Sequence, residues 1–303
     1  MKKYFTVDVF TNKLFGGNPL AVFIDAEKLS TSQMQSIASE INYSETAFVL
    51  KPDNPKNSAK VRIFTPKSEL SFAGHPNVGT GFILCKKPEL IPGEYSNEKL
   101  VFEEIAGLVD IFPQYGKDNI IKGCSIKAPS NFKISSILPP SIIADCLSVS
   151  EKSISLKRSK PVIGGVGLDF GIVEVRDKRV LSSCRCNISA FEKAEKKFGN
   201  GDYPFSLLAF SEENKSNYSV RVFAPLDGII EDPATGSACG ALGGLLASFT
   251  KETSGSFNYT MRQGKEIGHP SIIEISVVKK NKTSENPMIK GNCIEVSEGI
   301  FYL

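Results

Sequence analysis

Two long stretches without a charged residue constrain what this 303-residue chain can fold into. The first spans residues 74–85, the second spans residues 233–250, and both are rich in glycine. Each glycine in an exposed helix costs about 1 kcal/mol relative to alanine. A helix of this composition is therefore stable only where other parts of the chain surround it closely on every side. We expect two buried helices, each wrapped by strands.

The second stretch also invites comparison with a membrane-spanning helix, for which about 18 apolar residues suffice. Its proline, serines, threonines and glycines leave little surface that suits lipid. A buried helix is therefore the favoured interpretation of this stretch.

A short motif precedes both stretches. RIFTP at residues 62–66 recurs as RVFAP at residues 221–225. Each copy has the pattern of a strand that ends at a proline, and the glycine that opens an uncharged stretch follows. Self-similarity of this kind indicates a duplicated half, with a pseudo-two-fold relation between the copies.

Most of the remaining chain alternates short β-branched and aromatic runs with glycine, proline or polar breaks, which is typical of strands. Helical periodicity is limited to short segments near residues 31–41, 140–146 and 190–198, and residues 30–32, beginning with Ser30, offer N-caps to the first of them. The chain is therefore predicted to be mostly β, with few helices.

The length predicts two domains, at about 150 residues each. The polar, proline-interrupted segment 127–131 is the best candidate linker. We therefore expect domains at residues 1–127 and 128–303, with the last strands able to return to the first domain.

Composition restricts the class of protein further. Hydrophobic residues make up 41% and charged residues 23%, which indicates an ordinary folded protein. The net charge of +3 is too small to predict nucleic acid or an acidic membrane surface as the main partner.

The cysteine and histidine content restricts which disulfides, metal sites and acid–base groups the chain can form. The seven cysteines are odd in number, irregularly spaced and without a CxxC pair, so neither a disulfide framework nor a zinc ribbon is predicted. Asp8 comes before any long apolar run, so no signal peptide is predicted and a reducing, cytoplasmic location is expected. His75 and His269 are the only two histidines, so no multi-histidine metal centre is expected. The acid–base chemistry must therefore depend on carboxylates.

The helices expected to open at Gly74 and Gly236 each present backbone N–H groups and the positive end of a dipole. Directed at one cleft, two such ends form an anion site suited to a carboxylate or a developing enolate. Every helix has such an end, so the interpretation depends on the flanking chemistry. His75 follows Gly74, and an acidic pair at residues 231–232 precedes Gly236.

Several short motifs resemble the PhzF-like family, the phenazine-biosynthesis isomerase family, which shares its fold with diaminopimelate epimerase and proline racemase. In chain order they are VDVFT at 7–11 with GNP at 17–19, SETAF at 44–48, FAGHP at 72–76 and EDPATGSA at 231–238. QG at 263–264 extends the match. Each motif is weak alone, but together, in the family's order, they are specific.

The resemblance implies an α+β fold of two pseudo-symmetric domains, each a β-barrel-like sheet wrapped around a central helix, as in diaminopimelate epimerase. It also implies an active site between the domains, a homodimer and no cofactor. The characterised phenazine enzymes isomerise 2,3-dihydro-3-hydroxyanthranilate, so the implied partner is a small-molecule carboxylate.

The resemblance assigns the catalytic roles to Glu45, His75 and Asp232, with Glu45 as the carboxylate that shuttles the proton. A carboxylate in an apolar cleft can accept a proton from one carbon and return it to another. Glu45 precedes an apolar strand at 46–50, so partial burial is expected. The structural alternatives are a solvated carboxylate for Glu45, a capping and packing role for His75, and a helix N-cap for Asp232.

Gly74, Gly236 and Ser237 are the substrate-binding residues that the resemblance implies. A neutral His75 is expected to donate a hydrogen bond to a substrate oxygen, because a positive helix end opposes protonation of the ring. Asp232 would hold a substrate amine or hydroxyl, or orient His75. Ser237 is a candidate carboxylate ligand, or else an ordinary serine of a first helical turn.

The epimerase relatives use two cysteine thiols, one before each helix-opening glycine, whereas this chain has Ala73 and Thr235 there. A two-thiol racemase is therefore disfavoured, because neither side chain exchanges a proton at neutral pH. Cys239 is expected to be a small buried core residue. His269 stands where the family commonly has an arginine, so it is left out of the catalytic set.

The leading hypothesis is a cofactor-independent isomerase that moves a proton on a small carboxylate-bearing substrate, resembling trans-2,3-dihydro-3-hydroxyanthranilate isomerase. The alternatives are an epimerase or lyase of the same fold with a different substrate, or a non-catalytic ligand-binding or interaction protein. The sequence does not identify the substrate.

Overall fold

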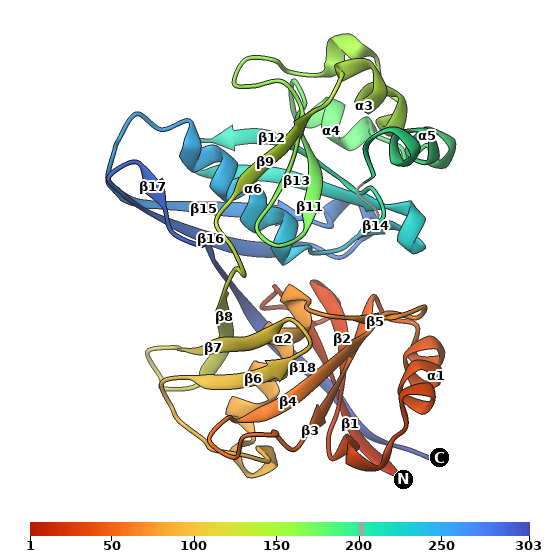
Figure 1. Ribbon diagram of the computed structural model, residues 1–303, viewed down its shortest axis with the longest axis vertical. Coiled ribbons are helices and arrows are strands. Elements are labelled where there is room, and N and C mark those ends of the chain that lie inside the picture. Colours follow the sequence, from red (N-terminus) through yellow and green to blue (C-terminus); the bar gives the residue numbers. More distant parts are fainter. Residues whose placement is uncertain (200–202) are drawn as a thin grey trace. The chain divides into compact units, whose positions relative to one another are not determined.

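The structure is a computed structural model, and it describes residues 1–199 and 203–303. The chain divides into two compact units (Figure 1). Unit 1 comprises Met1–Lys127 and Lys290–Leu303, and unit 2 comprises Ala128–Ile289.

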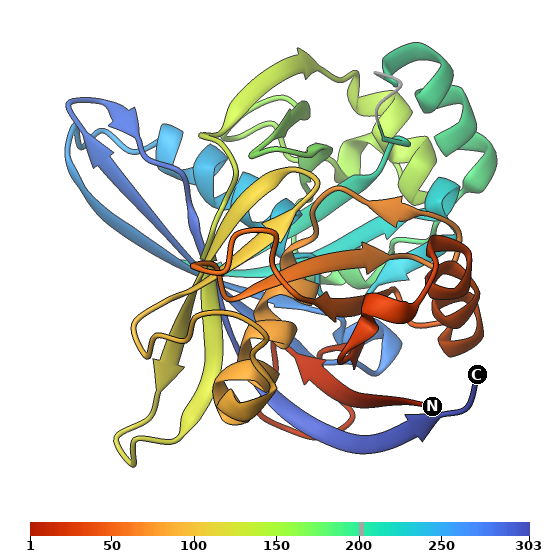
Figure 2. The ribbon, with the colours of Figure 1, turned by 60° about the horizontal axis from the view of Figure 1, so that its bottom comes forward.

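The strands of unit 1 close into a ring around helix α2 (Gly74–Lys86). In order around the ring they are β1 (Lys2–Val9), β2 (Asn18–Phe23), β3 (Glu45–Leu50), β4 (Ala59–Phe64), β6 (Leu100–Glu104), β7 (Gly107–Tyr115), β8 (Ile121–Lys127) and β18 (Met288–Phe301). β18 pairs with β1 along most of its length, which brings the two chain ends side by side (Figure 2). The ring leaves no free edge in this part of the unit.

Two further elements complete unit 1. Helix α1 (Thr31–Ile41) packs its apolar face, including Met34 and Ile37, against the outer face of β2, β3 and β4. Its N-cap is Ser30, which forms a capping box with Gln33, so the predicted helix start is confirmed. Strand β5 (Glu69–Leu70) is a short partner of β4, and the 3-10 turns are η1 (Ala26–Lys28) and η2 (Pro88–Leu90).

Unit 2 wraps a sheet around helix α6 (Gly236–Ser248), which contacts β10, β11, β15 and β16. The paired strands run in the order β9 (Lys133–Ile137), β10 (Val162–Gly165), β11 (Asp169–Glu174), β12 (Leu207–Asn214), β13 (Asn217–Ala224), β15 (Gly255–Gln263) and β16 (Ser271–Lys280). Strands β14 (Ile229–Asp232) and β17 (Thr283–Ser284) add to β13 and β16.

The outer face of this sheet carries its own apolar cluster, with Phe191, Ile143 and Leu181 among its buried members. They belong to helices α3 (Pro140–Leu147), α4 (Lys178–Ser183) and α5 (Ile188–Phe198). The 3-10 turns of unit 2 are η3 (Glu151–Ser153), η4 (Pro225–Asp227) and η5 (Lys265–Ile267).

The two units have the same order of strand pairings. From β1 to β7 in unit 1, skipping the short β5, successive pairs are antiparallel, parallel, antiparallel, parallel and antiparallel. From β10 to β16 in unit 2, skipping β14, the sequence of pairings is identical. The repeated sequence motif lies on β4 and β13, which are equivalent strands in this order.

The first residue of each motif copy makes the same kind of contact. Arg62 forms a two-pronged ion pair with Glu69, with Nε–Oε1 and Nη2–Oε2 distances of 2.6 and 2.7 Å. Arg221 forms the same pair with Glu231, at 2.9 and 2.6 Å. A planar guanidinium suits this bidentate geometry. The likeness of the two motif copies therefore extends to their side-chain contacts.

Both glycine-rich helices are buried, as their composition predicts. Gly74–Cys85 are all buried in α2, and in α6 only Ser237 and Ser248 are not. A Cβ atom on Gly81 would lie 2.4 Å from Ile111 Cγ2, and one on Gly244 would lie 2.3 Å from Phe132 Cβ. Glycine is therefore required at these positions by the close approach of neighbouring residues.

The predicted α+β architecture, with strands wrapped around a glycine-rich helix, is confirmed. Within residues 1–199 and 203–303, no helix combines the length and apolarity needed to cross a membrane. The uncharged stretch 233–250 contains a helix of 13 residues that begins only at Gly236, after a loop. Sequence patterns did not predict β9, β10 or α4, because these elements are short and β10 ends in two glycines.

Replacing Gly244 by alanine is expected to lower the free energy of unfolding by about 1–3 kcal/mol, because the methyl group collides with Phe132. Gly240→Ala on the same helix is the matched control, since its nearest contact is the flexible end of Ile289 at 3.1 Å. The control should stay within about 1 kcal/mol of the wild type. Urea unfolding of both variants measures the difference, and equal stabilities would contradict the packing explanation.

Candidate active site

In unit 1, β3 and α2 bring Glu45 and His75 together. Glu45 is the first residue of β3, and β3 pairs in parallel with β2 so that Glu45 lies opposite Leu20. His75 is the second residue of α2. Its Nδ1 atom lies 3.3 Å from Glu45 Oε2, and the side chains are 5% and 15% exposed for His75 and Glu45. The partial burial expected for Glu45 is therefore present.

The start of α2 offers backbone N–H groups without a side-chain cap. The N-cap residue is Ala73, which has an extended backbone and no polar side chain. In most helices a serine, threonine or aspartate at this position satisfies one of the first amides. Gly74, the first residue of the helix, adds no side chain either, so this end is suited to an anionic group.

Burial lowers the pKa of His75 to about 3, and the backbone carbonyl of Pro19 opposes the fall only in part. The ring is therefore neutral at physiological pH, and its contact with Glu45 is not an ion pair. A neutral imidazole carries one N–H donor and one acceptor nitrogen. His75 Nε2 has no hydrogen-bond partner among the described residues. Since the Pro19 carbonyl accepts from the single N–H of the neutral ring, Nε2 can accept one further hydrogen bond.

In unit 2, Asp232 ends β14 and Gly236 begins α6, with Thr235 as the N-cap. The Thr235 hydroxyl donates a hydrogen bond to the carboxylate of Asp232. The N-cap position is therefore held by Thr235 and not by Asp232. Ser237 is the second residue of α6 and is partly exposed. It occupies the same place on α6 as His75 does on α2.

Gln263, at the end of β15, holds this loop in place. Its Nε2 donates to the carbonyl of Asp232 at 2.8 Å and to Thr235 Oγ1 at 3.1 Å, and its Oε1 accepts from the amide of Thr235 at 3.1 Å. Gln263 is 1% exposed, and its partners Asp232 and Thr235 are half-buried. Its only sequence signal was the QG pair at 263–264, which does not predict the contacts.

The structure also shows the surroundings of Cys239, expected to be a core residue, and of His269, which was left out of the predicted catalytic set. Cys239 is fully buried in α6, and burial raises the pKa of its thiol, which confirms it as a core residue. His269 contributes backbone bonds: its N–H donates to the Gly264 carbonyl at 2.9 Å, and its carbonyl accepts from Ser271 at 2.8 Å.

The structure thus forms two clusters of candidate residues. Gly74, His75 and Glu45 lie together in unit 1, and Asp232, Gly236 and Ser237 lie along one short segment in unit 2. In the parts of the chain that the structure describes, no three His, Cys, Asp or Glu side chains are grouped to hold a metal ion.

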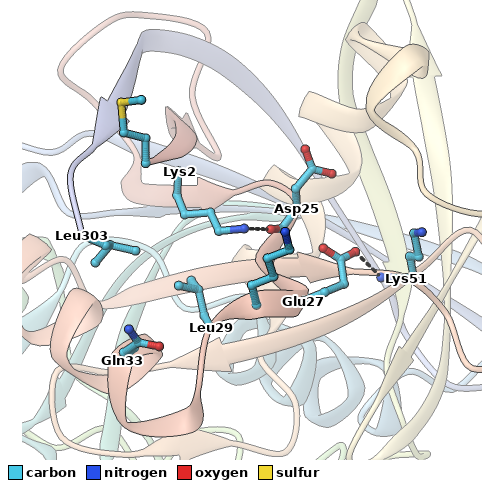
Figure 3. A pocket seen from close by; sticks show the side chains of 9 residues that line it. Lys2, Asp25, Glu27, Leu29, Gln33, Lys51 and Leu303 are labelled. Carbon is cyan, nitrogen blue, oxygen red and sulfur yellow. Dashed lines mark hydrogen bonds between the residues drawn. The ribbon is translucent and has the colours of Figure 1, made fainter.

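A surface pocket of about 720 Å³ lies elsewhere on unit 1, next to the chain termini (Figure 3). Lys2 donates a hydrogen bond to the carbonyl of Asp25 there, and the amide of Lys51 donates to Glu27 at 2.9 Å. None of the residues that line it is a candidate site residue.

Known proteins resemble this chain along its whole length. A crystal structure from Bacillus anthracis, a phenazine biosynthesis protein of the PhzF family, has a TM-score of 0.87 at 24% identity and covers 100% of this chain and 99% of that chain. Trans-2,3-dihydro-3-hydroxyanthranilate isomerase of Pseudomonas aeruginosa is 31% identical over 305 residues, with 100% of both chains covered. An uncharacterized isomerase of Mesorhizobium japonicum is 30% identical over 308 residues, covering 100% of this chain and 99% of the relative.

The fold, the two helix ends with their polar residues and these relatives together define the class: the protein is an isomerase. A family model described as phenazine biosynthesis-like protein matches residues 7–299. The chain therefore belongs to the phenazine biosynthesis-like (PhzC-PhzF) family, and the resemblance noted in the sequence is confirmed.

The lowered pKa of His75 predicts how stability depends on pH. The unfolded chain protonates this ring near pH 6.5 and the folded chain only near pH 3, so the unfolded state binds more protons between these values. The contribution of His75 to stability is therefore lost as the pH falls through this window. His75→Asn should lose about 2 kcal/mol less than the wild type between pH 7.5 and pH 5, measured by urea unfolding. An identical pH dependence in both proteins would contradict the buried, neutral ring.

Replacing Gln263 by leucine is expected to lower the free energy of unfolding by about 1–3 kcal/mol, because it removes the three hydrogen bonds that this buried side chain makes to Asp232 and Thr235. Gln35→Leu is a control that removes one bond, to the Thr65 carbonyl, at a less buried place. The control should cost less than about 1 kcal/mol. If Gln263→Leu were as mild as the control, the loop would not depend on this amide.

Proposed function

We propose that the protein is a cofactor-independent isomerase that moves a proton between two carbons of a small carboxylate-bearing molecule. The observation that carries the proposal is the 3.3 Å contact between Glu45 Oε2 and Nδ1 of a neutral His75, at the glycine-opened start of α2. The Pseudomonas aeruginosa relative is named for an isomerisation of trans-2,3-dihydro-3-hydroxyanthranilate. A related dihydroaromatic amino acid is therefore the first substrate to test.

Glu45 is the proposed proton carrier. Its carboxylate accepts a proton from one substrate carbon, holds it as a carboxylic acid and returns it to another carbon. The limited exposure of Glu45 favours the same proton being returned, since exchange with bulk water is slowed. A positioned acid–base group of this kind contributes about 10²–10⁴-fold to the rate.

His75 is proposed to accept a hydrogen bond from a substrate hydroxyl through Nε2, the ring nitrogen that does not face Glu45. Because burial keeps the ring neutral, it does not place a permanent positive charge beside Glu45. A cation there would favour the ionised carboxylate and make Glu45 a weaker base. The neutral ring supplies a hydrogen bond without that cost to basicity.

The remaining candidate residues are also proposed to bind substrate groups. The backbone N–H groups that start at Gly74 suit a carboxylate, as do those that start at Gly236, where the Ser237 hydroxyl is a further donor. Asp232 would bind an amine or hydroxyl group. The contact with Thr235 and the bonds from Gln263 support this role, because they hold Asp232 in one position.

The finer properties of the protein are also proposals. We propose that it forms a homodimer, works in the cytoplasm, acts on small molecules and does not bind nucleic acid. All seven cysteines are free thiols in the structure, which is compatible with a reducing compartment.

Glu45→Gln is expected to lower solvent-deuterium incorporation into the substrate by about 10²–10⁴-fold, because glutamine cannot carry the proton. Ligand binding should persist, since glutamine keeps the size of the side chain. Trans-2,3-dihydro-3-hydroxyanthranilate and a panel of small amino and carboxylic acids are the probes, with mass spectrometry of the product as the measurement.

Glu40→Gln, at an exposed position near the end of α1, is the matched control and should leave exchange unchanged. Exchange that continues undiminished in Glu45→Gln would refute the role of Glu45. Turnover that continues in the control but stops in Glu45→Gln, with binding retained, would support it.

A further inference from the structure

A second carboxyl group lies inside unit 1 near the start of α2. Glu104 is the last residue of β6 and pairs with Gly107 of β7. Side chains alternate along a strand, so Glu104 shares a face with Leu100 and Phe102, which are fully buried. Both of its carboxyl oxygens are shielded from solvent, and neither has a hydrogen-bond partner among the described residues.

Glu103, the preceding residue, points to the opposite face of β6 and has several hydrogen-bond donors around its carboxylate. Glu103 accepts hydrogen bonds from the amides of Asp53 and Asn54, and from the side chain of Asn57 at 2.7 Å. Three donors of this kind stabilise an ionised carboxylate. Glu104 lacks such donors, so the two adjacent acids are in opposite environments.

Asn77, in the first turn of α2, lies next to Glu104, and its amide partly stabilises the ionised form of that acid. Asn77 is fully buried, and its Nδ2 donates to the carbonyl of the N-cap residue Ala73 at 3.0 Å. Its Oδ1 has no donor among the described residues. A buried acceptor left without a donor costs about 1–3 kcal/mol.

Only one protonation state of Glu104 supplies the missing donor. An ionised carboxylate has acceptors alone, whereas a neutral carboxylic acid has one O–H donor. If the neutral carboxyl of Glu104 turns its O–H toward Asn77 Oδ1, that oxygen gains a donor while Asn77 keeps its bond to Ala73. When Glu104 carries a proton, its O–H donor therefore matches the acceptor Asn77 Oδ1, which has no other donor among the described residues.

Burial raises the pKa of Glu104 to about 8, and Asn77 opposes the rise only in part. Ionisable groups on the surrounding elements are engaged elsewhere: Lys60 with Asp53, Arg62 with Glu69, Lys99 with Asp110, Lys86 with Glu295, and His75, which is neutral, with Glu45. Charged neighbours therefore do not account for the neutral state, which follows from burial.

We propose that Glu104 is a positioning residue of the isomerase site: its neutral carboxyl holds Asn77, and Asn77 holds Ala73 and with it the first turn of α2. The inference rests on the proposed function of Gly74 and His75 in binding an anionic substrate. When Glu104 loses its proton to solvent, the O–H donor disappears and a negative charge arises beside that turn. Both changes oppose the binding of an anion there.

The kinetic test compares wild type with Glu104→Gln from pH 6.5 to 9.5. In the wild type, KM for the carboxylate substrate should rise above pH 8, by about 10-fold per unit of pH once Glu104 is ionised, with kcat less affected. Glutamine stays neutral and keeps an N–H donor for Asn77, so Glu104→Gln should bind as well as wild type at pH 7 and lose this rise. Glu98→Gln, an exposed acid just before β6, should behave as wild type.

A second measurement needs no substrate. In NMR spectra, the amide signals of Gly74 and His75 in the wild type should shift with a midpoint near pH 8, and these shifts should be absent in Glu104→Gln. The contribution of Glu104 to the stability of the wild type should also fall as the pH rises from about 5 to 8, opposite in direction to that of His75, because Glu104 ionises in the unfolded chain but not in the folded one. Glu104→Gln should lack this part of the fall.

The outcomes separate the two proposals. Equal pH dependence of the Gly74 and His75 signals in both proteins would overturn the positioning role, whatever the substrate is. Shifts that follow Glu104 without a change in KM would also overturn it, because the turn would respond and binding would not. Undiminished deuterium exchange in Glu45→Gln would instead overturn the proposed function and leave the NMR result standing.

Discussion

The close packing of strands against two glycine-rich helices is the constraint on which the rest of the structure depends. At Gly81 and Gly244 the space for a single methyl group is already occupied by neighbouring side chains. Because glycine has no side chain at these positions, the strands of unit 1 approach α2 closely, and the sheet of unit 2 approaches α6 closely. Each helix also starts at a glycine, after an N-cap residue that makes no capping bond. The packing that stabilises the core therefore also produces two helix ends suited to anions.

Burial sets the protonation states near the start of α2. His75 is kept neutral by the same exclusion of water that raises the pKa of Glu104. Two groups of opposite charge type are thus both uncharged at neutral pH near the start of one helix. In the proposed function, the backbone N–H groups bind the anion, Glu45 moves the proton and the neutral His75 bonds a substrate oxygen.

Much of the fold could be predicted from the sequence, because local residue patterns indicate its main elements. The uncharged stretches predicted the buried helices, the repeated RIFTP and RVFAP motifs marked equivalent strands, and Ser30 marked the start of α1. The short elements β9, β10 and α4 were missed, since a few residues give little periodicity. Gln263 and Glu104 were missed because their roles come from partners distant in the sequence, or from burial that no local pattern reports.

The sequence by itself determined the fold class, the family and the identity of the candidate residues, because these depend on composition, periodicity and ordered motifs. Only the tertiary structure decided that Glu45 meets His75, that Thr235 and not Asp232 holds the N-cap of α6, and that Glu104 lies beside Asn77. The protonation states of His75 and Glu104 also depend on the tertiary structure, since the pKa of a side chain depends on how far protein atoms replace water around it.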